Sequence, residues 1–256
     1  MSSNKPLGDF LRSRRYLLDP AALGVVSARR RRTPGLRREE VAARAGISCE
    51  WYIKLEQGRE VSASPETIAA LARALALDDT EAAHLRKLAA RQAAPRFVRE
   101  KVPETVEAIV RALSEPAYVT GARLDVLCWN DAADRIFGFS GMSEAERNIL
   151  RYMMASPAAR ALFGSSWTAE AQRITALFRA TYDQYRGDLL FEDMVVTLQG
   201  VSAEFRAWWL SYRVATPSSG RKMLLSEGHD GTSFVYATFQ ANDDPALKLA
   251  VYTRVT

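Results

Sequence analysis

Residues 36–58 read LRREEVAARAGISCEWYIKLEQG, and this stretch decides the fold of the first part of the chain. Its apolar residues recur at helical spacing on both sides of Gly46, which predicts two short helices joined by a tight turn. Glycine takes the left-handed backbone conformation of such a turn without strain. Ser48 is a good N-cap for the second helix, and the small Ala42 and Ala45 let the two helices pack closely. The stretch therefore predicts a helix-turn-helix.

The second helix of a helix-turn-helix presents its N-terminal part to base edges in the major groove of DNA. Glu50 can accept a hydrogen bond from cytosine N4, Lys54 can donate one to guanine or to a phosphate, and Ile53 can contact a thymine methyl group. Basic residues before and at the start of the first helix suit contacts with DNA phosphates. The predicted DNA-binding residues are Arg30, Arg31, Arg37, Arg38, Ser48, Cys49, Glu50, Trp51, Ile53 and Lys54.

Several of these residues have a second interpretation. Trp51 fits the core as well as the surface, and Glu50 can simply be an acidic residue that the helix dipole favours. Tyr52 is expected in the core. The arginine run at 29–32 can be solvated charge rather than a phosphate site, and Cys49 is expected to be a passive small residue.

Helical signals also flank the motif. Residues 6–19 have apolar residues at helical spacing, the Ser-Pro pair at 64–65 is typical of a helix start, and residues 80–92 form another helical stretch. Residues 1–92 are therefore predicted to be an all-α domain of five helices. The next segment, residues 93–103, has two prolines and mixed charge, which is typical of a linker.

The remaining residues, 104–256, follow a different pattern. Residues 117–130 have β-rich ends around a glycine, which predicts a strand pair, and strand-like runs follow at 222–227, 232–240 and 247–255. Helical patterns lie between them, at 131–139, 146–156, about 168–186, 188–200 and 202–214. The chain is therefore predicted to be α+β, with a five-helix domain followed by a domain that has an antiparallel sheet and several helices.

Charge is distributed unevenly along the 256 residues, whose net charge is +5. Residues 1–101 contain 20 Lys and Arg against 12 Asp and Glu, whereas residues 102–256 contain 15 against 18. The first part therefore carries +8 and the second part −3. This asymmetry indicates a polyanion-binding module joined to a mildly acidic domain, and a basic segment without function is the alternative.

Composition also bears on other classes of protein. We find no apolar run long enough to span a membrane and no signal peptide, so a cytoplasmic location without membrane partners is expected. Two cysteines, Cys49 and Cys128, and two histidines disfavour a disulfide framework or a metal cluster. No phosphate-binding glycine loop or nucleophile motif is found, so we predict no catalytic residue, no metal and no cofactor.

Residues 35–59, GLRREEVAARAGISCEWYIKLEQGR, resemble the helix-turn-helix of XRE/Cro-type transcription regulators. The matching residues are Glu40, Val41, Ala42, Gly46, Ile47, Ser48, Trp51, Tyr52, Leu55, Glu56 and Gly58. The segments LGDFLRSRR and RRRRTPGLRREEVA resemble a narrower group, the MmyB-like regulators, and so do residues 123–138 (RLDVLCWNDAADRIFG) and 146–163 (ERNILRYMMASPAARALF). This resemblance implies that residues 104–256 form a PAS-like domain for ligand binding or dimerisation.

Fatty acids have been proposed as ligands of the MmyB-like group, so the resemblance implies a small apolar ligand enclosed by the sheet and its helices. Aromatic residues suit such a cavity, although most are expected to be ordinary core. The predicted ligand-binding residues are Trp129, Asn130, Arg147, Asn148, Tyr152, Phe178, Tyr182, Trp208 and Tyr236. Asn130 can instead cap the helix that follows it, and Arg147 can instead pair with an acidic residue.

The chain departs from the MmyB-like pattern after Trp209. The group usually has a histidine, an acidic residue and a valine there, whereas this chain has Tyr212, Arg213 and Val214. A role of that histidine and acid in packing or ligand contact therefore does not carry over to this chain.

Together these features predict a sequence-specific DNA-binding transcription regulator whose second domain senses a small apolar ligand such as a fatty acid. Its expected partners are double-stranded DNA, that ligand and a second copy of the chain, because one short recognition helix reads few base pairs. The alternative is a protein-interaction module, antitoxin-like or scaffold-like, that uses the helical domain to contact a protein. A sensor domain that holds flavin or haem is a third possibility.

Overall fold

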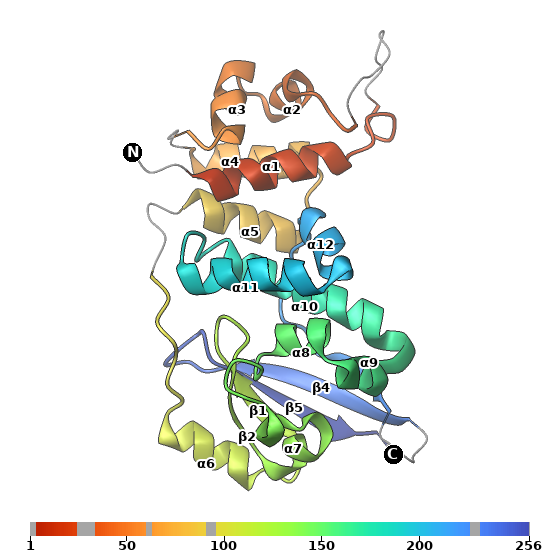
Figure 1. Cartoon of the computed structure of the whole chain (residues 1–256). Coiled ribbons are helices and arrows are strands. Elements are labelled where there is room, and N and C mark those ends of the chain that lie inside the picture. The colour runs from red at the N-terminus through yellow and green to blue at the C-terminus, as the bar shows by residue number, and fades with distance from the viewer. Residues whose placement is uncertain (1–3, 25–33, 60–62, 91–95, 226–230, 256) are drawn as a thin grey trace. The chain divides into compact units, whose positions relative to one another are not determined.

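The computed structural model of the chain describes residues 4–24, 34–59, 63–90, 96–225 and 231–255. The chain divides into two compact units, residues 1–95 and residues 96–256 (Figure 1). Each unit buries its own set of apolar side chains. No helix in the described ranges is both long and apolar enough to cross a membrane.

Five helices form the described part of the first unit, which confirms the predicted all-α domain. They are α1 (Lys5–Leu17), α2 (Arg38–Ala45), α3 (Cys49–Glu56), α4 (Pro65–Ala74) and α5 (Asp79–Ala89). The side chains of Ser48, Ser64 and Asp78 each accept a hydrogen bond from a backbone N–H in the first turn of the helix that follows. These caps satisfy amides that have no partner inside the helix, so three helix starts follow from local sequence.

The helices of the first unit pack around apolar side chains that are almost completely buried. Phe10 and Leu11 come from α1, Tyr52 from α3 and Leu71 from α4. Elements distant in the sequence therefore share one core, and the helix-turn-helix of α2 and α3 is supported by α1 and α4.

The second unit contains a five-stranded sheet among its described residues, and all neighbouring strands are antiparallel, as predicted. The strands are β1 (Ala117–Thr120), β2 (Val126–Trp129), β3 (Gly220–Leu224), β4 (Thr232–Gln240) and β5 (Lys248–Arg254), in the order β2-β1-β5-β4-β3. Tyr118 pairs with Ala250, and Tyr236 pairs with Tyr252. Because side chains alternate along a strand, the three tyrosines share one face of the sheet.

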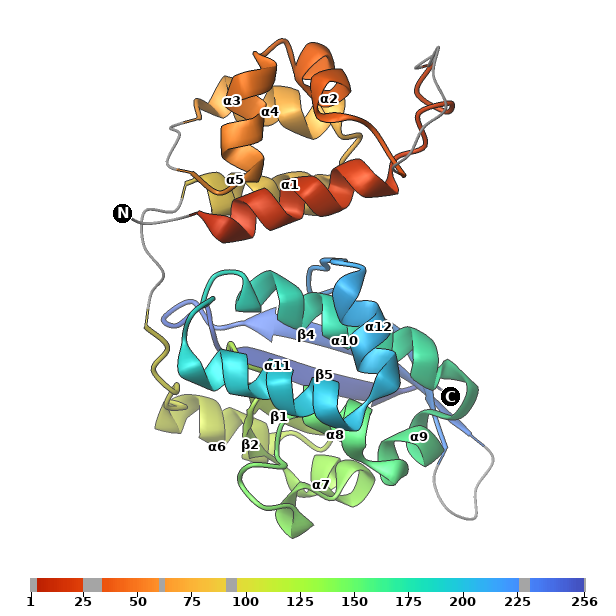
Figure 2. The ribbon, with the colours of Figure 1, turned by 45° about the horizontal axis from the view of Figure 1, so that its top comes forward.

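Helices cover both faces of this sheet (Figures 1 and 2). They are α6 (Glu104–Ala112), α7 (Asp131–Phe137), α8 (Ile149–Ala155), α9 (Pro157–Phe163), α10 (Trp167–Tyr182), α11 (Leu189–Val201) and α12 (Ala203–Leu210). The face with the tyrosines packs into the main core, which includes residues of α7 to α12. The opposite face packs on α6 through a small cluster that contains Val110 and Val119. Both α10 and α11 contact α12, and Figure 2 shows these three helices side by side.

Some elements of the second unit differ from the sequence prediction. Helices α6 and α9 were not predicted, although Pro103 at the start of α6 and the spacing of Val106 and Val110 are helical signals. The helix predicted over 202–214 ends at Leu210, because Tyr212 has a left-handed φ of 55° that does not continue a helix. Helix α10 likewise ends at Tyr182, earlier than expected.

Candidate DNA interface and ligand cavity

The turn between α2 and α3 is closed by backbone hydrogen bonds. Gly46 has φ of 67°, and its N–H bonds the carbonyl oxygens of Ala42 and Ala43. The N–H of Ile47 also donates to the Ala42 carbonyl at 3.0 Å. Any other residue at position 46 would hold this left-handed conformation under strain, so the glycine fixes the angle at which α3 leaves α2.

Helix α3 has a buried face and a partly exposed face. Tyr52 and Leu55 are buried, whereas the predicted DNA-binding residues of this helix are half-buried or exposed, namely Cys49, Glu50, Trp51, Ile53 and Lys54. Lys54 Nζ lies 2.8 Å from Glu50 Oε1, and the hydrogen bond and charge of Lys54 hold the pKa of Glu50 below its ordinary value. The exposed Ser48 uses its hydroxyl to cap the helix, accepting from the Trp51 N–H at 3.2 Å.

The predicted phosphate-binding arginines have different surroundings. Arg37 directly precedes α2, and its backbone N–H donates to the Glu40 carboxylate at 2.6 Å. The Arg38 guanidinium donates to Glu56 Oε1 at 2.9 Å, while its side chain stays 40% exposed. Arg38 therefore has a structural partner as well as access to solvent. Arg30 and Arg31 lie outside the described residues.

Glu56 is the buried charge that links these helices, a role that the sequence did not predict. Both oxygens accept from Arg15 at 2.8 Å, and a third Arg15 nitrogen donates to the Leu36 carbonyl at 2.9 Å. Burial alone raises the pKa of Glu56, but hydrogen bonds and charge from Arg15 and Arg38 outweigh burial and lower it. The cluster joins α1, α2 and α3, so it positions the helix-turn-helix.

The second unit encloses a cavity between the tyrosine-bearing face of the sheet and the helices above it. The cavity has a volume of about 820 Å³ when the solvent-filled space at its open mouth is included. It is lined by Tyr118, Thr120, Leu124, Phe137, Ile149, Tyr152, Met153, Phe163, Glu170, Arg173, Ile174, Leu177, Pro217, Lys222, Tyr236, Thr238, Lys248, Ala250 and Tyr252. Most of this wall is apolar or aromatic, with a few polar groups, as is usual in sites for small molecules.

One polar cluster lies in this wall. Glu170 Oε2 accepts from Arg173 Nε at 3.1 Å and lies 3.2 Å from Lys222 Nζ. Lys222 also donates to the Tyr252 hydroxyl at 3.3 Å, which is 3.2 Å from the Tyr118 hydroxyl. Burial raises the pKa of Tyr252 to about 12 and that of Tyr118 well above its ordinary value. Both hydroxyls therefore keep their protons at neutral pH.

Comparison with known families identifies both units. The family model described as the MmyB-like transcription regulator ligand binding domain matches residues 102–255, more than half of the chain. The chain belongs to the MmyB-like transcription regulators. A second model, described as a helix-turn-helix domain, matches residues 22–85. The protein is thus a DNA-binding transcription regulator with a ligand-binding domain, and both families are regulatory rather than enzymatic.

A search of curated proteins gave no matching relative of this MmyB-like regulator. Its described residues contain no group of three or more His, Cys, Asp or Glu side chains that could hold a metal ion. The residues that line its cavity are consequently the candidates for ligand recognition.

Two predicted ligand-binding residues of the regulator, Tyr152 and Tyr236, line the cavity. The remaining ones lie outside the lining: Trp129, Asn130, Arg147, Asn148, Phe178, Tyr182 and Trp208. The cluster of Glu170, Arg173 and Lys222 was not predicted from the sequence. The sequence does contain a signal for a polar site here. Lys222 and Leu224 are two residues apart in a predicted strand, so their side chains lie on the same face, and lysine is rare on a buried face.

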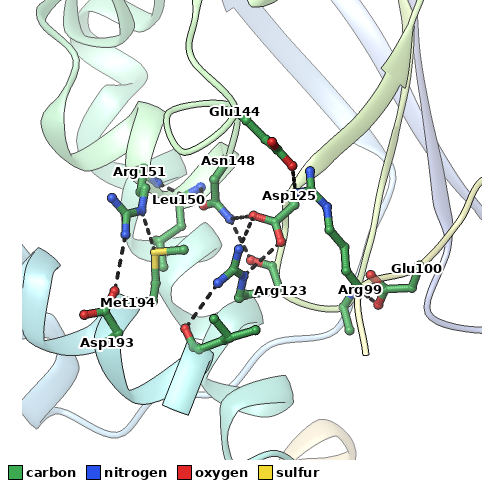
Figure 3. Close-up of polar contacts among 12 residues, drawn as sticks. Arg99, Glu100, Arg123, Asp125, Glu144, Asn148, Leu150, Arg151, Asp193 and Met194 are labelled. Atoms are coloured by element: carbon green, nitrogen blue, oxygen red, sulfur yellow. Dashed lines mark hydrogen bonds and ion pairs between the residues drawn. The ribbon is translucent and has the colours of Figure 1, made fainter. Parts of the chain in front are cut away.

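Asn148 holds the start of α8 rather than the cavity wall (Figure 3). Its amide nitrogen donates to Asp125 Oδ1 and to the Arg123 carbonyl, each at 2.9 Å. Its amide oxygen accepts from the N–H groups of Leu150 and Arg151 at 3.0 and 3.1 Å. Arg123 in turn pairs with Asp125 at 2.8 Å. The motif residues Arg123, Asp125 and Asn148 therefore tie the turn before β2 to α8.

Asn130 caps α7, which confirms its alternative interpretation. Its amide oxygen accepts from the N–H groups of Ala133 at 2.9 Å and Ala117 at 3.1 Å. Its amide nitrogen donates to the carbonyl oxygens of Leu113 and Glu115 at 2.9 and 2.8 Å. The buried side chain thus has partners on both its amide atoms, and it joins α7 to the beginning of β1.

The other predicted aromatic residues pack within the helices. Phe178 stacks on Phe191, and Trp208 lies against Trp167. The Tyr182 hydroxyl donates to the Glu192 carboxylate at 2.9 Å, which ties α10 to α11. Arg147, which can pair with an acid, instead lies over the ring of Trp129, with its guanidinium carbon 5.2 Å from the ring centroid.

Tyr212, where the family usually has histidine, belongs to a cluster around buried Arg179. The guanidinium carbon of Arg179 lies 3.3 Å from the ring centroid of Trp209 and 4.0 Å from that of Tyr212. Arg179 donates to the Trp209 carbonyl at 2.6 Å, and the Tyr212 hydroxyl donates to Asp183 at 3.3 Å. In this regulator the tyrosine therefore holds the end of α12 against α10.

Proposed function

We propose that this regulator reads an operator sequence with the exposed face of α3 and that occupancy of its cavity by a small apolar ligand, such as a fatty acid, changes its affinity for DNA. The observation that carries the proposal is the half-buried to exposed face of α3, which offers Glu50, Ile53 and Lys54 from a helix-turn-helix. The same chain has an aromatic-lined cavity, so a DNA-reading surface and a ligand site occur in one regulator.

On the DNA side, Glu50 and Lys54 would act as a pair. The ion pair holds the Lys54 side chain along the helix. Glu50 would therefore compete with a guanine or a phosphate for the Lys54 ammonium group. Arg37 and the first backbone amides of α2 would bind phosphate, since a helix N-terminus favours anions. Arg38 would add charge there while bound to Glu56. Cys49, Ser48 and Trp51 would lie against the same groove, and Arg30 and Arg31 would contact phosphates.

On the ligand side, the cavity is extended along the sheet. Lys248 and Tyr252 both line it and lie four residues apart on β5, so the lining spans roughly 13 Å at the usual rise of a strand. Tyr152 and Tyr236, which were predicted to bind ligand, would contact the molecule. An extended apolar chain suits this shape better than a compact, highly polar metabolite.

The DNA proposal is tested by selecting bound sequences from a random duplex library with the full chain and measuring affinity for the selected operator. Lys54→Ala should weaken operator binding by about 1–3 kcal/mol if Lys54 contacts a base, and should relax the selected sequence at one position. Lys87→Ala, which removes an exposed cation from α5, should have little effect on sequence preference. If the parent chain and both variants each bind scrambled DNA as tightly as the operator, the proposal that α3 reads the operator sequence is contradicted.

Ligand sensing is tested by titrating a medium-chain fatty acid into the regulator–operator complex. A ligand shifts DNA affinity only when it binds the DNA-competent and incompetent states differently. We expect a change in operator affinity with the parent chain, and an unchanged affinity at saturating ligand contradicts sensing. Absence of binding to every duplex tested at low salt would instead favour the alternative, a protein-interaction module.

We also propose that the regulator acts as a homodimer in the cytoplasm, where its DNA target is found. One α3 reads few base pairs, and a two-fold dimer would place two recognition helices about 34 Å apart on a pseudo-palindrome.

A further inference from the structure

The predicted linker, residues 93–103, is bound to the second unit through Phe97. This residue is 5% exposed, and its ring packs edge-on against those of Tyr185 and Phe191, whose centroids lie 5.7 and 5.2 Å away. The Phe97 N–H donates to Asp188 Oδ2 at 3.0 Å, and the same carboxylate caps α11. Phe97 therefore has a buried ring and a backbone hydrogen bond, neither of which a plain linker needs.

Glu100 is a second anchor of this segment, and it lies against the turn between β1 and β2. Its Oε1 accepts from the Ala122 N–H at 2.8 Å. A Cβ atom at Gly121 would overlap Glu100 Oε2, so the glycine leaves the room that the carboxylate occupies. Oε2 itself is buried and has no hydrogen-bond partner among the residues that the structure describes. Burial without a partner is unfavourable, so this anchor is only half satisfied.

Two arginines add contacts beside the anchors, and Figure 3 shows both with their acidic partners. Arg99 pairs with Glu144 across the segment. Arg123 pairs with Asp125 at 2.8 Å, and its guanidinium carbon lies 5.7 Å from the ring centroid of Phe97. The turn between β1 and β2 therefore contacts both anchors of the segment.

Leu124 connects this turn to the cavity. Its side chain lines the cavity, and its carbonyl accepts from the N–H of Ile149, a second lining residue, at 2.9 Å. Leu124 has φ of 67°, a left-handed conformation that costs free energy in a residue with a large side chain. Strain at Leu124 and the half-satisfied Glu100 both reduce the stability of the docked segment.

We propose that residues 97–100 form a latch on the second unit and that a molecule in the cavity releases this latch by displacing Leu124. The inference rests on the proposed function, because it takes the cavity as the ligand site. Displacement moves the turn that holds Glu100 and the Phe97 ring, and it lets Leu124 leave its left-handed conformation. The ligand then binds the released state more tightly than the docked state, which is the condition for a shift between them.

Release lengthens the chain between the two units. With the latch docked, residues 90–96 separate α5 from the first anchor, and with the latch released, residues 90–103 separate α5 from α6. An extended residue spans up to about 3.5 Å, so release adds as much as roughly 25 Å of reach. A longer tether lowers the effective concentration of one reading unit at the second half-site of an operator. Release therefore weakens operator binding.

The first test follows the latch by hydrogen exchange and mass spectrometry of the full chain. Peptides that span residues 97–102 and 121–124 should lose protection in Phe97→Ala, which removes the buried ring, and in Gly121→Ala, which fills the space of the Glu100 carboxylate. Val98→Ala is the matched control, because Val98 is 77% exposed and its truncation should keep the protection. Peptides of β4 and β5 should stay protected in all three variants, which separates release from unfolding. Unchanged protection in Phe97→Ala and Gly121→Ala overturns the latch.

The second test adds dodecanoate below its aggregation limit, with binding measured by calorimetry. Bound dodecanoate should lower the protection of the latch peptides in the parent chain to the level of Phe97→Ala. Leu124→Gly should bind dodecanoate and keep the protection, because glycine has no side chain in the cavity and takes a φ of 67° without strain. Leu177→Ala, which shortens a lining side chain of α10, should still release the latch. Protection that dodecanoate leaves unchanged or raises in the parent chain, or release that persists in Leu124→Gly, overturns the coupling.

Operator affinity separates the latch from the proposed ligand. Without any ligand, Phe97→Ala and Gly121→Ala should bind operator about threefold more weakly than the parent chain and Val98→Ala, since effective concentration falls roughly as the −3/2 power of tether length. Equal affinities overturn the effect of the latch on DNA. If dodecanoate does not bind, the proposed ligand is contradicted, while weaker operator binding by the two variants still supports the latch. Release by dodecanoate with unchanged operator affinity supports the latch and contradicts sensing.

Discussion

At the scale of single residues, Glu56 shows how one buried charge organises the DNA-binding unit. Its side chain is fully buried and bonds Arg15 through both oxygens, while Arg38 donates to it from the start of α2. Removing one partner of a buried ion pair leaves the other charges unpaired, which costs more than the pair itself contributes. The position of α3 therefore depends on a charge that is buried where α1, α2 and α3 meet.

We predict that Glu56→Gln lowers the free energy of unfolding of the first unit by about 3–5 kcal/mol, because Arg15 loses its buried counter-ion. Hydrogen exchange of the full chain, followed by mass spectrometry, measures this on peptides from residues 4–90. Glu39→Gln is the matched control, since the Glu39 side chain is 62% exposed and should change stability little. Equal protection of the two variants would contradict the role of Glu56.

The same residue predicts how stability depends on pH. The folded pKa of Glu56 lies below its ordinary value, so folding favours the ionised form. Its contribution is fully present above the unfolded pKa of about 4.3 and is lost as the pH falls through the folded pKa. Between neutral pH and strong acid the parent chain should therefore lose more stability than Glu56→Gln. Parallel acid profiles for the two chains, measured by the same exchange experiment, would contradict this.

At the scale of elements, the approach of α1 to α3 depends on Gly8. A Cβ atom built on Gly8 would lie 2.5 Å from the carbonyl oxygen of Glu56, which is closer than real Cβ atoms come to backbone. Alanine is the better helix former by about 1 kcal/mol, so helix propensity alone argues against glycine at this position near the start of α1. Packing between the two helices decides the residue here.

We predict that Gly8→Ala destabilises the first unit by roughly 1–2 kcal/mol, since overpacking outweighs the gain in helix propensity. Gly200→Ala in α11 is the contrasting control, because a Cβ atom there meets nothing within 4 Å. It should leave the second unit unchanged or slightly more stable. If the α1 and α3 peptides of Gly8→Ala were as protected from exchange as those of the parent chain, the prediction would be contradicted. The backbone would then accommodate the methyl group without loss of stability.

At the scale of the whole molecule, the uneven charge agrees with the two units of the regulator. Residues 1–101 carry +8 and residues 102–256 carry −3. The basic excess belongs with the helix-turn-helix, which meets a polyanion, and the mildly acidic part belongs with the ligand-binding domain. The positive charge is therefore concentrated in the DNA-binding part of the chain, and the excess of acidic residues in the ligand-binding part.

The proposed homodimer makes a prediction about the operator. Two half-sites separated by one helical turn of DNA, about 10 base pairs, should bind two chains, and inserting about five base pairs should weaken binding strongly because the half-sites then face opposite sides. Gel mobility shift with sedimentation of the complex measures affinity and stoichiometry. A complex with one chain per operator, or indifference to the insertion, would contradict the dimer.

Local chemistry explains what the sequence by itself determined. The helix-turn-helix, its glycine turn and the caps at Ser48, Ser64 and Asp78 depend on interactions within a few residues, so they could be read from the printed sequence. The antiparallel sheet could also be predicted, because alternation and turn residues are local signals. The family resemblance and the charge asymmetry then indicated DNA and a ligand.

Only the tertiary structure decided where the candidate ligand cavity lies and what holds the helices in place. Glu170, Lys222 and Tyr252 come from α10, β3 and β5, and the strand register brings them to one wall. Asn130 and Asn148, predicted as ligand contacts, cap α7 and α8 through local hydrogen bonds. Their amide nitrogens also donate to the carbonyl oxygens of Leu113 and Arg123, which are distant along the chain and could not be predicted from it. Which side chains touch one another depends on tertiary packing. Packing brings together residues that are far apart along the chain, and local sequence patterns do not show which of them will meet.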